Sequence, residues 1–137
     1  MLQHFEIHRR EKEGITILDV KGRLVVGEAS TMLREKMNAE VSNEVKQIVL
    51  NLEHVDYIDS TGLGTMVICC TTLHKSGGGL TLVHLNRRNL ELMVLTKLST
   101  IFQIFADEQD AVNSFFPDRE IKHFDILSFV QQHRGTE

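Results

Sequence analysis

Apolar residues recur with two different periods along the chain. Five short segments are rich in β-branched residues, and several alternate apolar with polar positions, which is typical of strands. The predicted strands are residues 5–8, 15–22, 47–52, 80–85 and 101–105. Polar or glycine-rich turns separate some of them, notably residues 11–14 and 76–79.

Between these strands, apolar residues stand three and four positions apart, a spacing that predicts amphipathic helices. The predicted helices are residues 28–41, 61–75, 88–98 and 108–115. The side chains expected on their inward faces are Met32, Leu33, Met37, Leu63, Met66, Val67, Cys70, His74, Leu92, Met93 and Leu95.

Strands that alternate with helices of this length indicate right-handed crossovers and a mostly parallel sheet. We therefore predict an α/β fold with a mixed, mostly parallel sheet of four or five strands, helices packed on it, and an antiparallel edge from the first hairpin. Residues 1–116 would form this domain and residues 117–137 a C-terminal extension. In the extension, apolar residues recur every third position from Ile121 to Val130, which favours a short helix, with a strand as the alternative.

The loops that leave the parallel strands share one edge of the predicted sheet. Open parallel sheets bind ligands and partners at that edge. Ser60 lies in the middle of it, and Arg87 and Arg88 should emerge on the same side. The loops in question are residues 24–28, 53–60, 85–88 and 106–107.

Composition narrows the classes of function. The chain has 137 residues and a formal net charge of −4, so one ordinary globular domain is expected. Slight acidity disfavours nucleic-acid binding. No apolar run approaches the roughly 20 residues of a membrane span, and the polar start does not resemble a secretory signal. We expect a cytoplasmic protein, a monomer or weak dimer, with no membrane insertion.

Catalytic and metal-binding chemistry find little support. Cys69 and Cys70 are adjacent in a predicted helix and should be reduced thiols, with Cys70 in the core and Cys69 more exposed. The seven histidines lack ligand spacing, so no metal is expected. Residues 62–67 partly match a dinucleotide fingerprint, but Val67 occupies the third glycine position. We predict no catalytic residue and no cofactor.

Ser60 stands at the entrance of the second predicted helix. A hydroxyl there can accept a hydrogen bond from an unpaired backbone N–H and act as an N-cap. The same position suits an anion, because the helix N-terminus carries partial positive charge. Spacing alone favours the cap, and attachment of a phosphate is the alternative.

The run Asp59-Ser60-Thr61-Gly62-Leu63-Gly64 resembles the signature of the STAS domain, named for sulfate transporters and anti-sigma factor antagonists. In the bacterial antagonists, this run carries a serine that the partner anti-sigma kinase phosphorylates. The resemblance implies a STAS-like fold up to about Phe115, a non-enzymatic binding switch, and Ser60 as phosphoacceptor with Thr61 as the alternate. The implied partner is an anti-sigma factor with serine kinase activity, which supplies ATP and magnesium.

One segment departs from the family pattern. Where the antagonists have Gly-Glu-Leu/Ile-Asp, this chain has Gly22-Arg23-Leu24-Val25. Loss of that carboxylate slightly favours a second hypothesis, a non-phosphorylated STAS scaffold subunit of a transporter or other signalling complex. Under the first hypothesis the partner-binding residues are Val25, Glu28, Asp56, Asp59, Thr61, Gly62, Leu63, Gly64, Arg87 and Arg88.

Overall fold

The computed structural model describes residues 4–135, with side chains described through Gln131. Strands β1 (Glu6–Lys12) and β2 (Ile15–Leu24) form an antiparallel hairpin. Glu13 and Gly14 close it with φ angles of 54° and 83°. Positive φ at both central residues is the backbone of a type I′ turn, whose twist matches that of the flanking strands.

Helices and strands alternate after the hairpin. The elements are α1 (Glu28–Ser42), β3 (Gln47–Ile58), α2 (Ser60–Lys75), β4 (Gly79–Val83), α3 (Arg87–Leu95), the 3₁₀ turn η1 (Leu98–Thr100), β5 (Gln103–Phe105), α4 (Glu108–Asn113) and α5 (Ile126–Gly135). The five strands form one sheet in the order β1-β2-β3-β4-β5, and β2 to β5 are parallel. The predicted α/β fold with a mixed, mostly parallel sheet is therefore confirmed.

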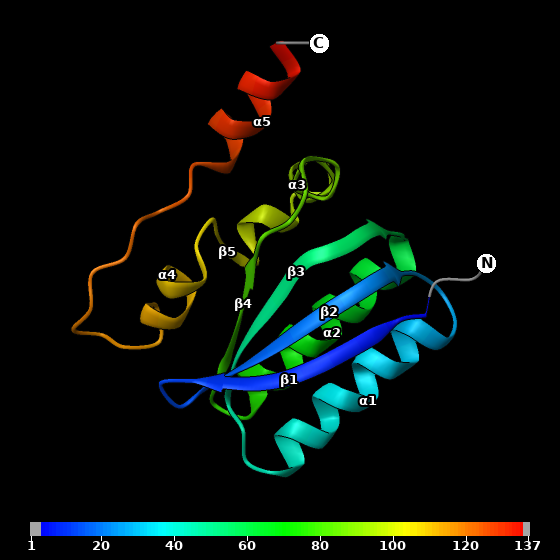
Figure 1. Cartoon of the computed structure of the whole chain (residues 1–137), viewed down its shortest axis with the longest axis vertical. Helices are drawn as coiled ribbons and strands as arrows, with labels where there is room; N and C mark the ends of the chain where they lie inside the picture. Colours follow the sequence, from blue (N-terminus) through cyan, green and yellow to red (C-terminus); the bar gives the residue numbers. More distant parts are fainter. Residues whose placement is uncertain (1–3, 136–137) are drawn as a thin grey trace.

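The helices form two layers on the sheet (Figure 1). Helices α1 and α2 pack side by side on one face of the sheet, with α2 behind the strands in this view, whereas α4 packs on the opposite face. The larger core joins the rear face of the sheet to residues such as Leu33 of α1 and Met66 of α2, both fully buried. The smaller core lies under α4 and includes Ile17, Val49 and Val112.

The C-terminal extension contains a helix, α5, but it begins at Ile126, so Ile121 and Phe124 of the periodic run precede it. Helix α5 packs against α3, and Val130 is buried as part of the larger core. Phe124 and Phe129 meet edge to face, with ring centroids 5.6 Å apart. Within residues 4–135, no helix combines the length and the apolar character needed to cross a bilayer. The division of the chain at residue 116 stays a prediction.

Strand β3 is longer than predicted. It runs to Ile58 rather than residue 52, because its second half continues to pair with β2 through register shifts between Asp19 and Lys21 and between Gly22 and Arg23. The expected loop over residues 53–60 is therefore mostly strand. The strand at residues 101–105 is shorter than predicted and begins at Gln103, since Ile101 still belongs to the end of the 3₁₀ turn.

In two helices, the buried face differs in part from the predicted one. In α3 the buried residues are Asn89, Leu90 and Met93, whereas Leu95 is 74% exposed. This helix ends early because Lys97 adopts a left-handed backbone with φ 62°. In α2 the inward stripe is centred on Cys69, which is more buried than Cys70, and His74 is exposed.

An ion-paired cluster holds the hairpin to the other elements. The guanidinium of Arg10 in β1 donates to Asp19 of β2 at 2.6 and 3.1 Å, and it also pairs with Glu108 of α4. Asn51 of β3 donates to Asp19 at 2.8 Å. Hydrogen bonds from Arg10 lower the pKa of both carboxyl groups.

The substitution Arg10→Met should make stability less sensitive to acid. Because their pKa values are depressed, Asp19 and Glu108 stabilise the folded state fully above their unfolded values of about 4, and this stabilisation is lost as pH falls. We expect the free energy of unfolding of wild type to exceed that of the variant by roughly 1 kcal/mol at pH 7 and by less at pH 3. Urea unfolding at both pH values measures the difference, and an equal gap at both would contradict the assignment.

Candidate functional site

The candidate site lies where β3 passes directly into α2. Asp59 is the single residue between the two elements, with extended backbone angles of φ −93° and ψ −178°. Its backbone N–H donates to the carbonyl of Leu24 at 3.2 Å, which continues the pairing of β3 with β2. Its carbonyl accepts the N–H of Leu63 at 2.9 Å, the first bond of the helix. The start of α2 is therefore fixed to the sheet without a flexible loop.

The N-cap of α2 is Asp59 and not Ser60, so the predicted cap was wrong by one residue. Oδ1 of Asp59 accepts the N–H of Gly62 at 2.7 Å, and Oδ2 accepts the N–H of Val26 at 2.9 Å. Ser60 is the first helical residue, and both Ser60 and Thr61 are exposed. Because the neighbouring carboxylate already performs the capping, the Ser60 hydroxyl has no capping role.

The next residues of the motif have structural roles inside the fold. A Cβ added to Gly62 would lie 2.2 Å from the carbonyl oxygen of Leu24, so only glycine allows α2 to approach the end of β2. The side chain of Leu63 is 7% exposed and belongs to the larger core. Gly62 and Leu63 therefore hold the site together from below, and Leu63 exposes only a small part of its side chain to the surface.

The loop from β2 to α1 borders the site. Val25 is half-buried, its carbonyl accepts the hydroxyl of Ser30 at 2.8 Å, and Val26 beside it is 68% exposed. Glu28 is exposed at the start of α1, and Asp56 is exposed near the end of β3. The surface around Ser60 thus mixes apolar groups with carboxylates.

Helix α3 reaches the same edge through two asparagines that the sequence analysis did not recognise as site residues. Asn86 caps the helix by accepting the N–H of Asn89 at 2.8 Å, and its amide donates to the carbonyl of Asp56 at 3.2 Å. The buried amide of Asn89 donates to the carbonyl of Val55 at 3.1 Å. The preference of asparagine for N-caps is a signal that could have identified Asn86, whereas no comparable signal marks Asn89.

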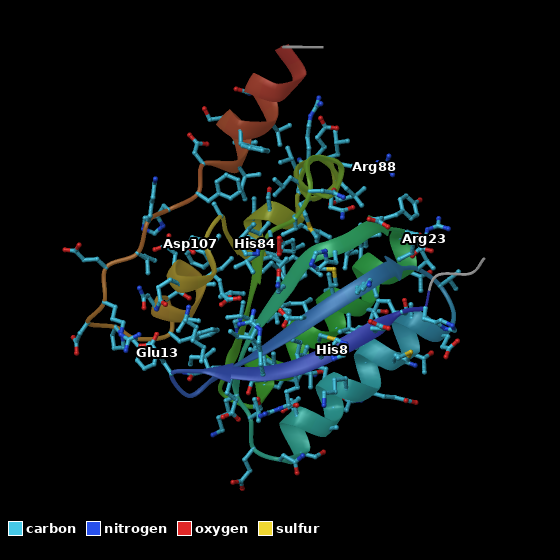
Figure 2. The ribbon with its side chains drawn as sticks, in the orientation of Figure 1. His8, Glu13, Arg23, His84, Arg88 and Asp107 are labelled. Atoms are coloured by element: carbon cyan, nitrogen blue, oxygen red, sulfur yellow. The ribbon has the colours of Figure 1, made fainter. Side chains whose placement is uncertain are left out.

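A groove of about 350 Å³ lies between the start of α2 and helix α3, and Ser60 and Arg88 both line it. Figure 2 shows Arg88 on α3 at the same end of the sheet as Arg23. Arg87 forms an ion pair with Glu91 of its own helix at 3.4 Å. The groove is lined mainly by apolar groups, namely those of Tyr57, Ile58, Leu63, Leu92 and Leu95.

The chemistry of this site is that of a presented hydroxyl beside an apolar groove. Burial raises the pKa of the Cys69 thiol to about 12, so the thiol stays protonated at neutral pH. Among the side chains of residues 4–131, no group of three His, Cys, Asp or Glu is placed to hold a metal ion. The arrangement suits recognition by another protein or covalent modification of Ser60.

Comparison with known proteins gives a consistent result. A family model described as the STAS domain matches residues 6–111. The anti-sigma-B factor antagonist of Bacillus subtilis is 31% identical over 103 residues, which cover 75% of this chain and 93% of that protein. The anti-sigma F factor antagonist of Paenibacillus polymyxa is 24% identical over 110 residues, with 80% and 93% coverage.

Solved structures agree with this fold. A candidate anti-sigma factor antagonist from Thermotoga maritima superimposes with a TM-score of 0.74 at 25% identity, covering 79% of this chain and 92% of that one. The murine anion transporter Slc26a9 matches with a TM-score of 0.64 at 19% identity, covering 75% of this chain and 18% of the transporter. At that identity, the second likeness concerns the fold alone.

The position of the cap gives a test of the site geometry. Asp59→Ala removes the acceptor for two backbone N–H groups and should cost about 1–2 kcal/mol of unfolding free energy. Ser60→Ala removes no cap and should change stability by less than about 0.5 kcal/mol. Urea unfolding of both variants measures this contrast. A larger loss for Ser60→Ala than for Asp59→Ala would make Ser60 the cap.

Proposed function

Because the chain belongs to the STAS domain family, we propose that it is an anti-sigma factor antagonist whose binding to an anti-sigma kinase is switched by phosphorylation of Ser60. The two antagonist relatives, each covered over 93% of its length, support the general role. The observation that supports the switch is the exposure of Ser60 at the first position of α2, with the cap supplied by Asp59.

In the unphosphorylated state the protein would dock its Ser60 edge on the kinase and so release the sigma factor. The kinase supplies ATP and magnesium, and this chain supplies only the hydroxyl. Exposure of Ser60 and Thr61 at the end of a rigid strand-to-helix junction makes either hydroxyl accessible to a kinase site. Such a protein would act in the cytoplasm, where sigma factors and their regulators meet.

Phosphorylation would change the electrostatics of the edge far more than its structure. A phosphoserine carries about −1.5 to −2 charges, which the helix N-terminus favours while the group stays in water. Burial of the same group in an interface without a partner cation costs on the order of several kcal/mol. Each 1.4 kcal/mol is about tenfold in affinity, so this cost is enough to switch binding off.

Arg88 is the cation best placed to respond to such a phosphate. It is exposed and lines the same groove as Ser60. We assign it a modest role, in contact either with the phosphate or with an acidic surface of the partner. An exposed pair of this kind contributes roughly 0.2–1 kcal/mol and weakens with salt.

A non-phosphorylated scaffold subunit is the second candidate, and Val25 is the observation that favours it. The residue that replaces the family carboxylate is apolar and half-buried, so its side chain offers neither charge nor a hydrogen-bond acceptor to a kinase. In that role α2 would serve as a docking surface without modification. Neighbouring reading frames separate the two candidates, since a kinase-like anti-sigma gene supports the first and an ATP-binding transporter gene the second.

Incubation with the anti-sigma kinase of the same organism and ATP should add one phosphate to the protein. Intact-mass and peptide mass spectrometry should locate it on Ser60, with Thr61 as the alternate. Ser60→Ala, which leaves the cap intact, is the control and should remain unmodified at position 60. An active kinase that modifies its other substrates but never residues 60 or 61 would argue against the switch and for the scaffold.

The effect of a negative charge at position 60 on kinase binding can be separated from the effect of side-chain size. Ser60→Asp introduces one negative charge at a helix start that favours it, so the fold should be as stable as wild type. Affinity for the kinase should fall at least about tenfold, because a burial cost of only 1.4 kcal/mol produces that change. Ser60→Asn, similar in size and neutral, is the matched control in calorimetric titration. An equal loss of kinase affinity for both substitutions would indicate a steric effect instead.

A further inference from the structure

The outward face of α2 lacks charge over most of its length. From Ser60 to His74 the sequence contains no Asp, Glu, Lys or Arg. By contrast, α1 exposes Glu28, Arg34 and Glu35. Surface helices usually carry charged residues on the face opposite the core. Solvent exposure alone does not explain a helix whose exposed side is neutral for almost its entire length.

This neutral face forms a continuous stripe that begins at the candidate phosphoacceptor. Ser60, Gly64 and Ile68 follow each other at four-residue spacing, and all three are exposed. Val67 and Thr71 lie beside them. We call these five residues the α2 stripe.

Apolar side chains stand out in the second half of the stripe. Ile68 is 49% exposed, and Ile101, which follows the 3₁₀ turn η1, is 55% exposed. A groove of about 350 Å³ separates the two elements and is lined by Val67, Cys70, Thr71, His74, Lys75 and Ile101. Ile101 and the half-buried Val67 thus give this groove an apolar lining, Ile68 adds an exposed apolar side chain on the same helix, and such groups are a feature of protein interaction sites.

Gly64 leaves the backbone of this face open to close approach. A Cβ added at Gly64 would meet no atom within 4 Å, and its backbone does not have positive φ. The fold therefore does not require glycine there, although glycine within a helix is less stable than alanine. Gly62, two residues earlier, is required by the carbonyl of Leu24. A glycine that the isolated fold does not need allows the backbone of a partner to approach closely.

We propose that the α2 stripe is the docking track for the anti-sigma partner, which contacts it through an uncharged, apolar surface and passes its backbone over Gly64. This inference rests on the proposed function and extends it from one residue to a helix face. Continuity favours that partner over other occupants, because Ser60 is the first residue of the same stripe. A second copy of this chain is the competing occupant.

The neutral stripe would also increase the effect of a phosphate on Ser60, the first residue of the stripe, on partner binding. An interface that supplies no lysine or arginine from residues 60 to 74 offers a phosphate no counter-charge from its own helix. With only the exposed Arg88 across the groove as a weak counter-charge, the phosphate would be buried largely uncompensated or kept in water, and either outcome weakens binding of the partner.

The decisive variant is Gly64→Ala, for which stability and affinity should change in opposite directions. The melting temperature should rise by roughly 2–5 °C, because alanine favours the helix and the added methyl group meets open space. Affinity for the purified anti-sigma kinase should fall at least about tenfold, since the methyl group blocks the close approach. A more stable variant with unchanged affinity would overturn the role of Gly64.

Ile68→Lys tests the apolar part of the track against a matched control. Leu127 of α5 is 56% exposed, so Leu127→Lys adds the same charge at a similarly exposed apolar site away from the stripe. In calorimetric titration with the same kinase, Ile68→Lys should weaken binding at least about tenfold, and Leu127→Lys less than twofold. Sedimentation velocity without kinase reports self-association of both variants.

The outcomes separate this inference from the proposed function. If Ser60→Asp weakens kinase binding while Gly64→Ala and Ile68→Lys bind as wild type does, the docking track is wrong and the switch stands. If Ile68→Lys alters only self-association, the stripe contacts a second copy and the inference is overturned. If wild type itself binds no anti-sigma kinase, the proposed function fails together with the track.

Discussion

The two hydrogen bonds accepted by Asp59 determine the geometry of the whole functional edge. One oxygen holds the N–H of Gly62 at the start of α2, and the other holds the N–H of Val26 in the loop before α1. The backbone of the same residue continues the pairing of β3 with β2 through Leu24. One carboxylate thus joins a strand, a helix and a loop, and its own negative charge is partly balanced by the helix N-terminus. The absence of a longer linker means that Ser60 inherits the rigidity of the sheet.

Separation of the cap from the proposed phosphoacceptor would have a functional consequence. If serine capped its helix, phosphorylation would place the ester at the capping oxygen, and the hydrogen bonds at the helix start would have to rearrange around the phosphate. With Asp59 as cap, a phosphate on Ser60 would change surface charge while the helix start keeps its hydrogen bonds. Gly62 and Leu63 reinforce this arrangement from the interior. The edge is therefore suited to report modification through electrostatics rather than unfolding, which agrees with the proposed switch.

The order and type of the elements could be predicted well from the sequence. A helix or strand with one buried face carries apolar residues at a regular spacing, and that spacing is visible in the sequence. The sequence predicted less well the features that depend on contacts between distant segments. Strand β3 extends to Ile58 through pairing with β2 and its register shifts, which no local period reveals. The wrong cap has a similar origin, since Asp59 and Ser60 are both good capping residues and the choice depends on the N–H of Val26 thirty-three positions away. Likewise, the inward position of Leu90 in α3 follows from the asparagines that attach this helix to β3.

The substitution at Val25 can be understood from the same geometry. The loop that contains it is held by backbone groups, namely the carbonyl of Val25 and the N–H of Val26, so its shape does not depend on a carboxylate at position 25. Relative to the family pattern, the edge has lost one negative charge near Ser60. A phosphate there would meet less repulsion from its own protein, and Arg88 would be less opposed as a counter-charge. The partner would then distinguish the phosphorylated from the unphosphorylated protein mainly through the cost of burying the phosphate against a neutral helix face. Repulsion between the phosphate and nearby carboxylates would contribute less. The uncharged α2 stripe and the uncharged residue 25 would then act together, because under the proposed function the phosphate on Ser60 would be the main source of the change of charge.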